Sequence, residues 1–186
     1  MATRNYSAQT AYIGWSSMRL VSFNLRTGKE ITRHAEDHGS AVGVLPYDPV
    51  RKCVCLIKMA RAPVILKEEE DIFEVPAGCV DDQEPIAAVK MEALEEVGLQ
   101  LKNVEFIVRA WSMPAVSTEQ IGLYLASYGT SDRVAVGGGR SDEDEEIDVF
   151  EVPIAELWEL YEKGILSDMK TILLTQALRL RHPELF

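Results

Sequence analysis

The chain has 186 residues, of which 47% are hydrophobic and 26% are charged, and its formal net charge is −11 with a pI near 4.8. This length suits one domain of ordinary size with a small addition, and it allows a sizeable buried core. No stretch supplies the basic surface that a nucleic-acid backbone requires, so no nucleic-acid partner is expected. An anionic small substrate would need a metal ion to bind.

Compartment can be predicted from apolar runs and cysteines. The longest apolar runs, such as residues 54–57, are far too short to cross a bilayer, and no signal-peptide pattern opens the chain. The three cysteines are an odd number without zinc-site spacing, which indicates reduced thiols. We therefore expect a cytoplasmic protein with no membrane partner. Cys53 and Cys55 are expected to pack in the core on opposite sides of one strand.

The N-terminal segment, residues 1–37, is predicted to be a small β unit, and residues 38–186 the main domain. Residues 21–25 alternate in the manner of a strand, a Thr-Gly turn follows, and Ile31 lies in a second short strand. Two strands alone are only marginally stable. We therefore expect this unit to pack on the main domain or on a second subunit.

Strands and helices alternate through the main domain. A hairpin is predicted over residues 41–59, because two apolar segments flank a Pro-Tyr-Asp-Pro turn. A strand is expected at residues 72–75, ended by Pro76, and a helix from Pro85 with Gly98 as its C-terminal cap. This order predicts an α+β layered fold. The remaining elements are expected to be strands at 104–111, 121–128 and 147–152, a helix at 154–163, and a final helix through Leu180 that Asp168 caps.

Three acids stand in the last two turns of the helix that begins at Pro85. Glu92, Glu95 and Glu96 lie where the helix dipole is negative, so each carboxylate is unfavourable by roughly 0.3–1 kcal/mol. Glu92 and Glu96 are four residues apart, so they share a face and repel each other. A positive partner is therefore expected. Mg²⁺ or Mn²⁺ suits oxygen ligands that converge in this way.

This segment resembles the signature of the Nudix hydrolases, which runs glycine, five residues, glutamate, seven residues, Arg-Glu, then Glu-Glu and a glycine. Gly78 and Glu84 keep the first spacing, and the three helix glutamates with Gly98 keep the last. There are two departures. Only six residues separate Glu84 from the position of the signature arginine, and Met91 occupies that position. The arginine usually orients the middle glutamate, which is Glu95 here.

The resemblance covers about residues 38–181 and is closest to the nucleoside-diphosphate-sugar branch, the ADP-ribose pyrophosphatases and GDP-mannose hydrolases. A proline loop that ends in Thr118-Glu119 supports this placement. The glycine run 137–139, the acids before Ile147 and the pair Lys170-Thr171 look more like the GDP-mannose hydrolases. The fold implied is a Nudix-type α/β/α sandwich with a mixed sheet, preceded by the small β unit.

The resemblance implies three groups of site residues. The implied metal ligands are the carbonyl of Ala77 and the carboxylates of Glu92, Glu96 and Glu145. The residues implied to contact the nucleotide sugar are Arg61, Glu119 and Lys170. The implied catalytic residues are Glu95 and Glu143. Glu143 is the candidate base, because relatives place a glutamate two residues before the last metal ligand.

The activity implied is Mg²⁺-dependent hydrolysis of the pyrophosphate bond of a nucleoside-diphosphate sugar, with Mn²⁺ as the other candidate metal. GDP-mannose is slightly preferred and ADP-ribose is next, and the protein is expected to be a homodimer whose N-terminal strands cross to the partner. A catalytically silent Nudix-like nucleotide sensor is the alternative that Met91 favours. A phosphatase or nuclease of another fold is a third, although neither a Gly-Lys-Ser/Thr phosphate loop nor a Gly-x-Ser-x-Gly elbow occurs.

Overall fold

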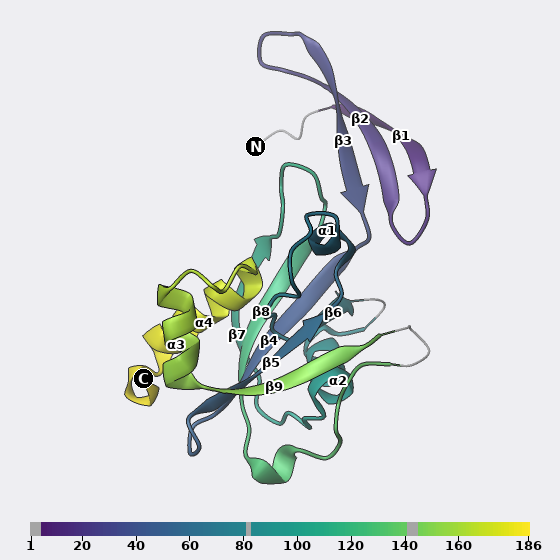
Figure 1. Cartoon of the computed structure of the whole chain (residues 1–186). Helices are drawn as coiled ribbons and strands as arrows, with labels where there is room; N and C mark the ends of the chain where they lie inside the picture. Colours follow the sequence, from purple (N-terminus) through teal and green to yellow (C-terminus); the bar gives the residue numbers. More distant parts are fainter. Residues whose placement is uncertain (1–4, 81–82, 141–144) are drawn as a thin grey trace. The chain divides into compact units, whose positions relative to one another are not determined.

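The computed structural model describes residues 5–80, 83–140 and 145–186 and divides into two compact units (Figure 1). Unit 1 comprises Met1–Ser40 and Ala110–Ile121, and unit 2 comprises Ala41–Arg109 and Gly122–Phe186. The strands are β1 (Tyr6–Ile13), β2 (Ser17–Asn24), β3 (Glu30–Asp37), β4 (Ser40–Asp48), β5 (Cys53–Met59), β6 (Ala77–Val80), β7 (Glu105–Trp111), β8 (Gln120–Ser127) and β9 (Ile147–Pro153). The α-helices are α1 (Ala62–Ile65), α2 (Pro85–Val97), α3 (Ile154–Glu162) and α4 (Met169–Arg181), and short 3-10 turns are η1 (Thr130–Asp132) and η3 (Pro183–Leu185).

Unit 1 is built on a three-stranded antiparallel sheet in the order β1-β2-β3. The sequence predicted the two strands on either side of the Thr-Gly turn and missed β1. No residue described between Asn5 and Ser40 is buried, and every residue of β1 is exposed. The large side chains of Tyr6, Tyr12 and Ile13 are 72%, 63% and 77% exposed. Without a core of its own, a sheet of this size is marginally stable.

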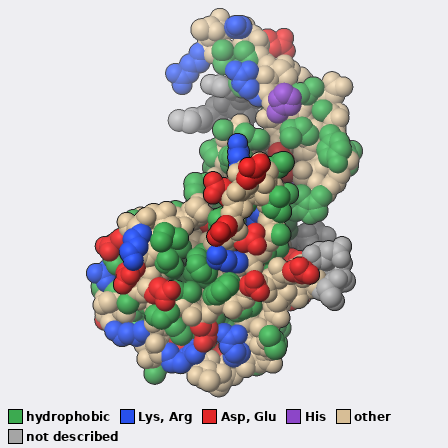
Figure 2. Space-filling model, in the orientation of Figure 1, with side chains coloured by type: hydrophobic (Ala, Val, Ile, Leu, Met, Phe, Trp, Pro, Cys, Tyr) green, Lys and Arg blue, Asp and Glu red, His purple; other side chains and the backbone are tan. Residues whose placement is uncertain are grey.

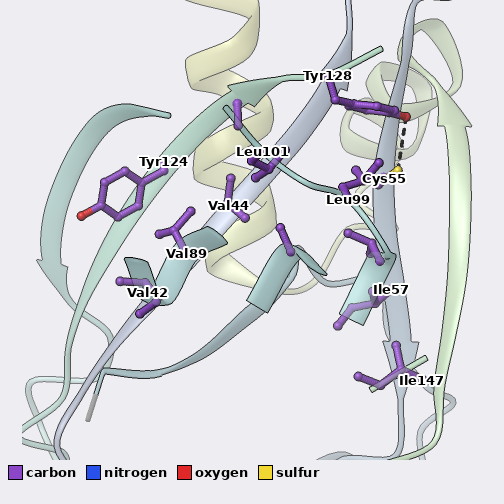
Figure 3. Close-up of a cluster of buried hydrophobic side chains, with 14 residues drawn as sticks. Val42, Val44, Cys55, Ile57, Val89, Leu99, Leu101, Tyr124, Tyr128 and Ile147 are labelled. Atoms are coloured by element: carbon purple, nitrogen blue, oxygen red, sulfur yellow. Dashed lines mark hydrogen bonds between the residues drawn. The ribbon is translucent and has the colours of Figure 1, made fainter. Parts of the chain in front are cut away.

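Unit 2 contains a sheet in the order β7-β8-β4-β5-β9, with β6 paired to β4. Val42, Cys55 and Ile57 belong to a buried cluster that includes Val89 and other residues of α2 (Figure 3). Alternate residues of β5 point to the other side of the sheet. Helix α3 contacts β5, and α4 packs on α3. Helices therefore cover both faces of the sheet (Figure 1), and the predicted α+β sandwich is confirmed.

The strand before α2 lies later in the chain than predicted. Of residues 72–75 only Glu74 pairs, in an isolated bridge to Ile57, and the strand is β6 beyond the proline. Pro76 has no N–H, but its carbonyl accepts a hydrogen bond from the Val44 N–H at 2.9 Å, which leads the chain into pairing with β4. The prediction of α2 is confirmed, with Gly98 in the left-handed conformation at φ 68°.

Cys53 and Cys55 are buried, as predicted, but the prediction that they face opposite sides was wrong. Their Sγ atoms lie 3.6 and 3.2 Å from the same Tyr128 hydroxyl oxygen. Residues two apart in a strand share a face, so both thiols meet this phenol. Cys53, Cys55 and Tyr128 thus form a small polar cluster, and Figure 3 shows the hydrogen bond between Cys55 and Tyr128.

The surface and the helices bear on partners. Acidic and basic side chains are interspersed on the face of the molecule in Figure 2. Within the described ranges, no helix is long and apolar enough to cross a membrane.

Candidate active site

The last turn of α2 carries the acid at the centre of the candidate site. Glu96 is 2% exposed, and its Oε2 accepts a hydrogen bond of 2.9 Å from the N–H of Ala77 at the start of β6. The helical period places Glu96 on the inner face, and β6 runs beside α2. The prediction that Ala77 and Glu96 share a site is therefore matched by a direct contact between them.

Glu96 has little compensation for its charge. Its pKa is raised to about 8, mainly by burial and also by the carboxylates of Glu92 and Glu145, although the Ala77 N–H and the Arg61 guanidinium lower it. The Glu92 carboxylate lies against Gly78, the residue after Ala77, so the structure brings Ala77, Glu92 and Glu96 together. Glu145 and Arg61 also act on the charge of Glu96. No cation in the described part of the chain forms an ion pair with Glu96.

The site fits a hard divalent cation by its chemistry. The side chains that surround Glu96 offer carboxylate oxygens, which Mg²⁺ and Mn²⁺ prefer. Gly78 lies so close to the Glu92 carboxylate that an added Cβ would overlap it, so a side chain at this position would displace the carboxylate. Among the residues described, no three acidic, histidine or cysteine side chains form a complete group that could hold a metal by themselves.

Glu95 and Glu145 are joined by Arg140, which follows the glycine run. The Arg140 guanidinium lies 3.6 Å from Glu95 Oε1, and its backbone N–H donates to Glu145 Oε2 at 3.1 Å. Sequence reasoning missed Arg140, because a loop residue has no period that would point it at a helix. The candidate base, Glu143, falls within residues 141–144, outside the described part of the chain.

Two predicted substrate contacts meet at a buried acid. Glu74, 4% exposed, binds Arg61 at 2.8 Å and Lys170 at 2.9 Å through its two carboxylate oxygens. Asp168 binds Lys170 at 2.9 Å and caps α4 by accepting from the Thr171 N–H. Burial lowers the pKa of Lys170, but Asp168 and Glu74 outweigh it and raise the pKa, so Lys170 stays charged.

Sequence reasoning did not assign Glu74 to the site, although it named Asp168 as a cap. A signal was present, since Glu74 is a charged residue among strand-forming residues just before the signature. Acids in such positions are rarely buried unless they are paired.

The third predicted substrate contact, Glu119, belongs to unit 1. Its Oε1 lies 3.0 Å from His38 Nε2, while His38 Nδ1 lies 2.7 Å from Glu36 Oε1. The Ser117 hydroxyl donates to the other oxygen of Glu36 at 2.8 Å, and the Trp15 ring stacks on the imidazole with centroids 4.9 Å apart. The structure thus shows Glu119 paired with a histidine of its own unit.

Comparison with known proteins places this geometry in a family. The family model described as NUDIX domain matches residues 37–174. The chain belongs to the NUDIX family. The resemblance predicted from the signature is confirmed, and the two departures at residues 84–91 are variations within a Nudix protein.

Curated relatives of this Nudix protein share a name. A GDP-mannose pyrophosphatase of Cronobacter sakazakii is 36% identical over 170 residues, 88% of each chain. One of Salmonella typhimurium is 33% identical over 172 residues, 89% of each chain, and one of Escherichia coli is 33% identical over 162 residues, 84% of each. A solved structure described as an ADP compounds hydrolase superposes with a TM-score of 0.74 at 16% identity, covering 98% of this chain and 97% of its own, which supports the fold.

Proposed function

We propose that this Nudix protein hydrolyses the pyrophosphate bond of a nucleoside-diphosphate sugar, giving a nucleoside monophosphate and a sugar phosphate. GDP-mannose is the first candidate substrate, which the names of the curated relatives support, and ADP-ribose is the second. The free cysteines support a reducing compartment, and we propose the cytoplasm.

In this proposal the metal is Mg²⁺, with Mn²⁺ as the alternative, and it is held by the acids around Glu96. Its ligands would be the Ala77 carbonyl and the carboxylates of Glu92, Glu96 and Glu145. When bound, such an ion neutralises phosphate oxygens and lowers the pKa of a coordinated water. The raised pKa of Glu96 supports the assignment, because a buried acid among acids needs a cation to ionise.

The remaining proposed residues bind the substrate and move the proton. Arg61 and Lys170 would bind phosphate oxygens, and Glu119 would contact the nucleotide sugar. Water attacks one phosphorus, the bond to the bridging oxygen breaks, and Glu143 accepts the proton of the water, with Glu95 as the second catalytic residue. Because Glu74 holds both Arg61 and Lys170, their charged groups are oriented before substrate arrives.

The observation that carries the proposal is the buried Glu96 with its pKa raised to about 8 beside two further carboxylates. The experiment is a turnover panel of nucleoside-diphosphate sugars with the full chain, in EDTA and with Mg²⁺ or Mn²⁺ restored. We expect metal-dependent release of monophosphate and sugar phosphate. Full activity in EDTA after dialysis would overturn the metal role. Binding of nucleotide without turnover would favour a silent sensor, the alternative that Met91 supports.

We also propose that unit 1 makes a homodimer interface. The support is β1, which is exposed along its whole length and presents large apolar side chains. The Ile13→Lys variant of the full chain should become monomeric in light scattering, whereas Val50→Lys in unit 2, at a position 89% exposed, should not. A truncation of residues 1–37 should be monomeric or less stable. A truncated protein that stayed dimeric with an unchanged melting temperature would contradict this interface.

A further inference from the structure

The last turn of α2 supplies no cation to Glu95. The turn is completely described and contains no basic residue. Glu95 has Glu92 and Glu96 as neighbours and stands at the negative end of the helix dipole. The helix position that could best supply a partner is one turn earlier on the same face, and Met91 stands there.

Met91 contributes to a different feature. It lines a shallow groove of about 670 Å³ together with Lys90, Leu94, Gln100, Leu101 and Lys102. Its sulfur accepts from the Gln83 side-chain amide at 3.6 Å. A thioether offers Glu95 no charge, so the orientation of this carboxylate must come from another element.

That element is the segment 137–140, which lies against the end of α2. Gly138 N–H donates to the Glu96 carbonyl at 2.9 Å, and Gly139 N–H donates to the Glu95 carbonyl at 3.1 Å. Gly137 has φ 79°, and an added Cβ there would overlap the Glu96 carbonyl. The close approach therefore requires glycine, and it fixes where the next residue, Arg140, leaves the segment.

Arg140 uses two of its groups on two acids of the site. Its guanidinium lies 3.6 Å from Glu95 Oε1, with 39% and 27% of the two side chains exposed, and its backbone N–H binds Glu145 Oε2. A pair this open to solvent adds only a small amount to the free energy of unfolding, an amount that a double-mutant cycle can resolve. It can act on geometry instead, because a guanidinium beside Glu95 Oε1 favours one direction of this carboxylate, whereas the Glu145 contact is made by the backbone.

We infer that Arg140 is the positioning residue for Glu95, and that it does from the neighbouring segment what a cation at position 91 would do from the helix. This inference rests on the proposed function. It explains how a chain with methionine at that position retains an oriented acid, and it counts against the silent-sensor alternative.

The first test is a double-mutant cycle in the full chain with Arg140→Gln, Glu95→Gln and both. We expect Arg140→Gln to lower kcat by about 10- to 100-fold, with KM changed less than about 3-fold. The double variant should be no slower than Glu95→Gln alone. Losses that multiply, or a change confined to KM, would overturn the inference, because Arg140 would then act without Glu95.

The second test is rescue. Met91→Arg added to Arg140→Gln should recover at least about 10-fold of the lost kcat, since the new cation faces Glu95 one turn along the helix. In the wild-type background Met91→Arg should change kcat less than about 2-fold, and Met91→Leu is the matched control without charge. No recovery would show that the two positions are not equivalent, and the inference would fail.

Failure of the proposed function can be distinguished from failure of the inference about Arg140. If the wild-type protein cleaves no nucleoside-diphosphate sugar, the proposed activity is wrong and the cycle is read by urea unfolding and by Mn²⁺ titration without nucleotide. The two substitutions should then still be non-additive in the unfolding midpoint. Arg140→Gln should leave the Mn²⁺ affinity within about 3-fold, because the backbone contact to Glu145 remains. Additive midpoints, or loss of Mn²⁺ binding, would overturn the inference about Arg140.

Discussion

Two carboxylates of unit 2, Glu96 and Glu151, are treated in opposite ways. Glu151 accepts from both terminal nitrogens of Arg51 at 2.8 and 2.9 Å, from Arg133 at 3.0 Å and from the Tyr128 hydroxyl at 3.0 Å. The Arg51 hydrogen bonds are the main reason that its pKa falls to about 2. Glu96 has one backbone N–H and two neighbouring acids, and burial raises its pKa to about 8.

The difference matches the roles we propose, a structural acid at Glu151 and a metal-binding acid at Glu96. Around Glu151 every charge has its partner within the chain, so this network stabilises the fold and needs nothing further. Around Glu96 the described chain supplies too little positive charge, which costs stability, and in the proposed function a bound cation offsets this cost. The pKa raised by burial and like charge at Glu96 therefore supports the proposed site, whereas the pKa lowered by arginine at Glu151 fits a role in packing.

The largest effect is expected for Glu96→Gln. Turnover should fall by at least about 100-fold, because a metal ligand should matter more than its outer partners. In metal-free protein the same substitution should raise the stability at high pH. Since the folded pKa is about 8 and the unfolded pKa about 4.5, folding favours the protonated acid, and stability is lost as pH rises from about 4.5 through 8. Glutamine mimics the protonated form, so the variant should melt higher than wild type at pH 8 and similarly at pH 4.5.

The control is Glu84→Gln at the start of α2, which should change turnover and melting little. Calorimetry in EDTA at the two pH values measures the stability, and phosphate release with Mg²⁺ measures the turnover. If Glu96→Gln kept wild-type turnover, or melted lower than wild type at pH 8, the contrast between the two acids would be wrong.

A smaller effect is expected for Glu151→Gln, and in the other property. The unfolding free energy should fall by about 1–2 kcal/mol, because charge-assisted hydrogen bonds to a partly exposed acid are lost. Turnover per folded molecule should not change. The folded pKa is depressed to about 2, so this stabilisation is present above about pH 4.5 and is lost as pH falls through 2. Urea unfolding at pH 7 and pH 3 checks this, and equal losses of turnover and stability would contradict it.

The smallest effect concerns His38, where one cation stands between two acids. An imidazolium can donate to Glu36 and Glu119 together, whereas neutral imidazole has one N–H. Burial lowers the pKa of His38, but the two carboxylates outweigh it and raise the pKa above 6.5. Its stabilisation is complete below pH 6.5 and is lost as pH rises through the raised pKa.

Trp15 stacks on His38, so the fluorescence of Trp15 should change when the imidazole loses its proton. The difference in fluorescence between wild type and Trp15→Phe, followed from pH 5 to pH 9, should show a midpoint above 6.5. A midpoint at or below that value would show that the acids do not hold the proton.

Local signals predicted part of this protein well. The bounds of α2, its cap at Gly98 and the cap of α4 at Asp168 were predicted to within a few residues. The closeness of Glu92 and Glu96 on one face of α2 was also predicted. Glu74 and Arg140 were missed, because their partners lie far along the chain. β1 was missed because its residues bury nothing, so no alternation with a core marks it. The error at Cys53 and Cys55 was one of strand geometry and needed no structure to correct.

The two ends of the segment that carries the acidic run meet. The Ile147 N–H donates to the Gly138 carbonyl at 3.3 Å, while Gly138 is itself bound to the end of α2. The two ends of the segment are therefore held at one place, as the ends of a compact surface loop are. Closing a longer loop at such a junction costs little, since each doubling of its length adds only about 0.6 kcal/mol. Extra residues inserted into this segment should therefore cost the domain little stability, provided that Arg140, Glu143 and Glu145 are retained.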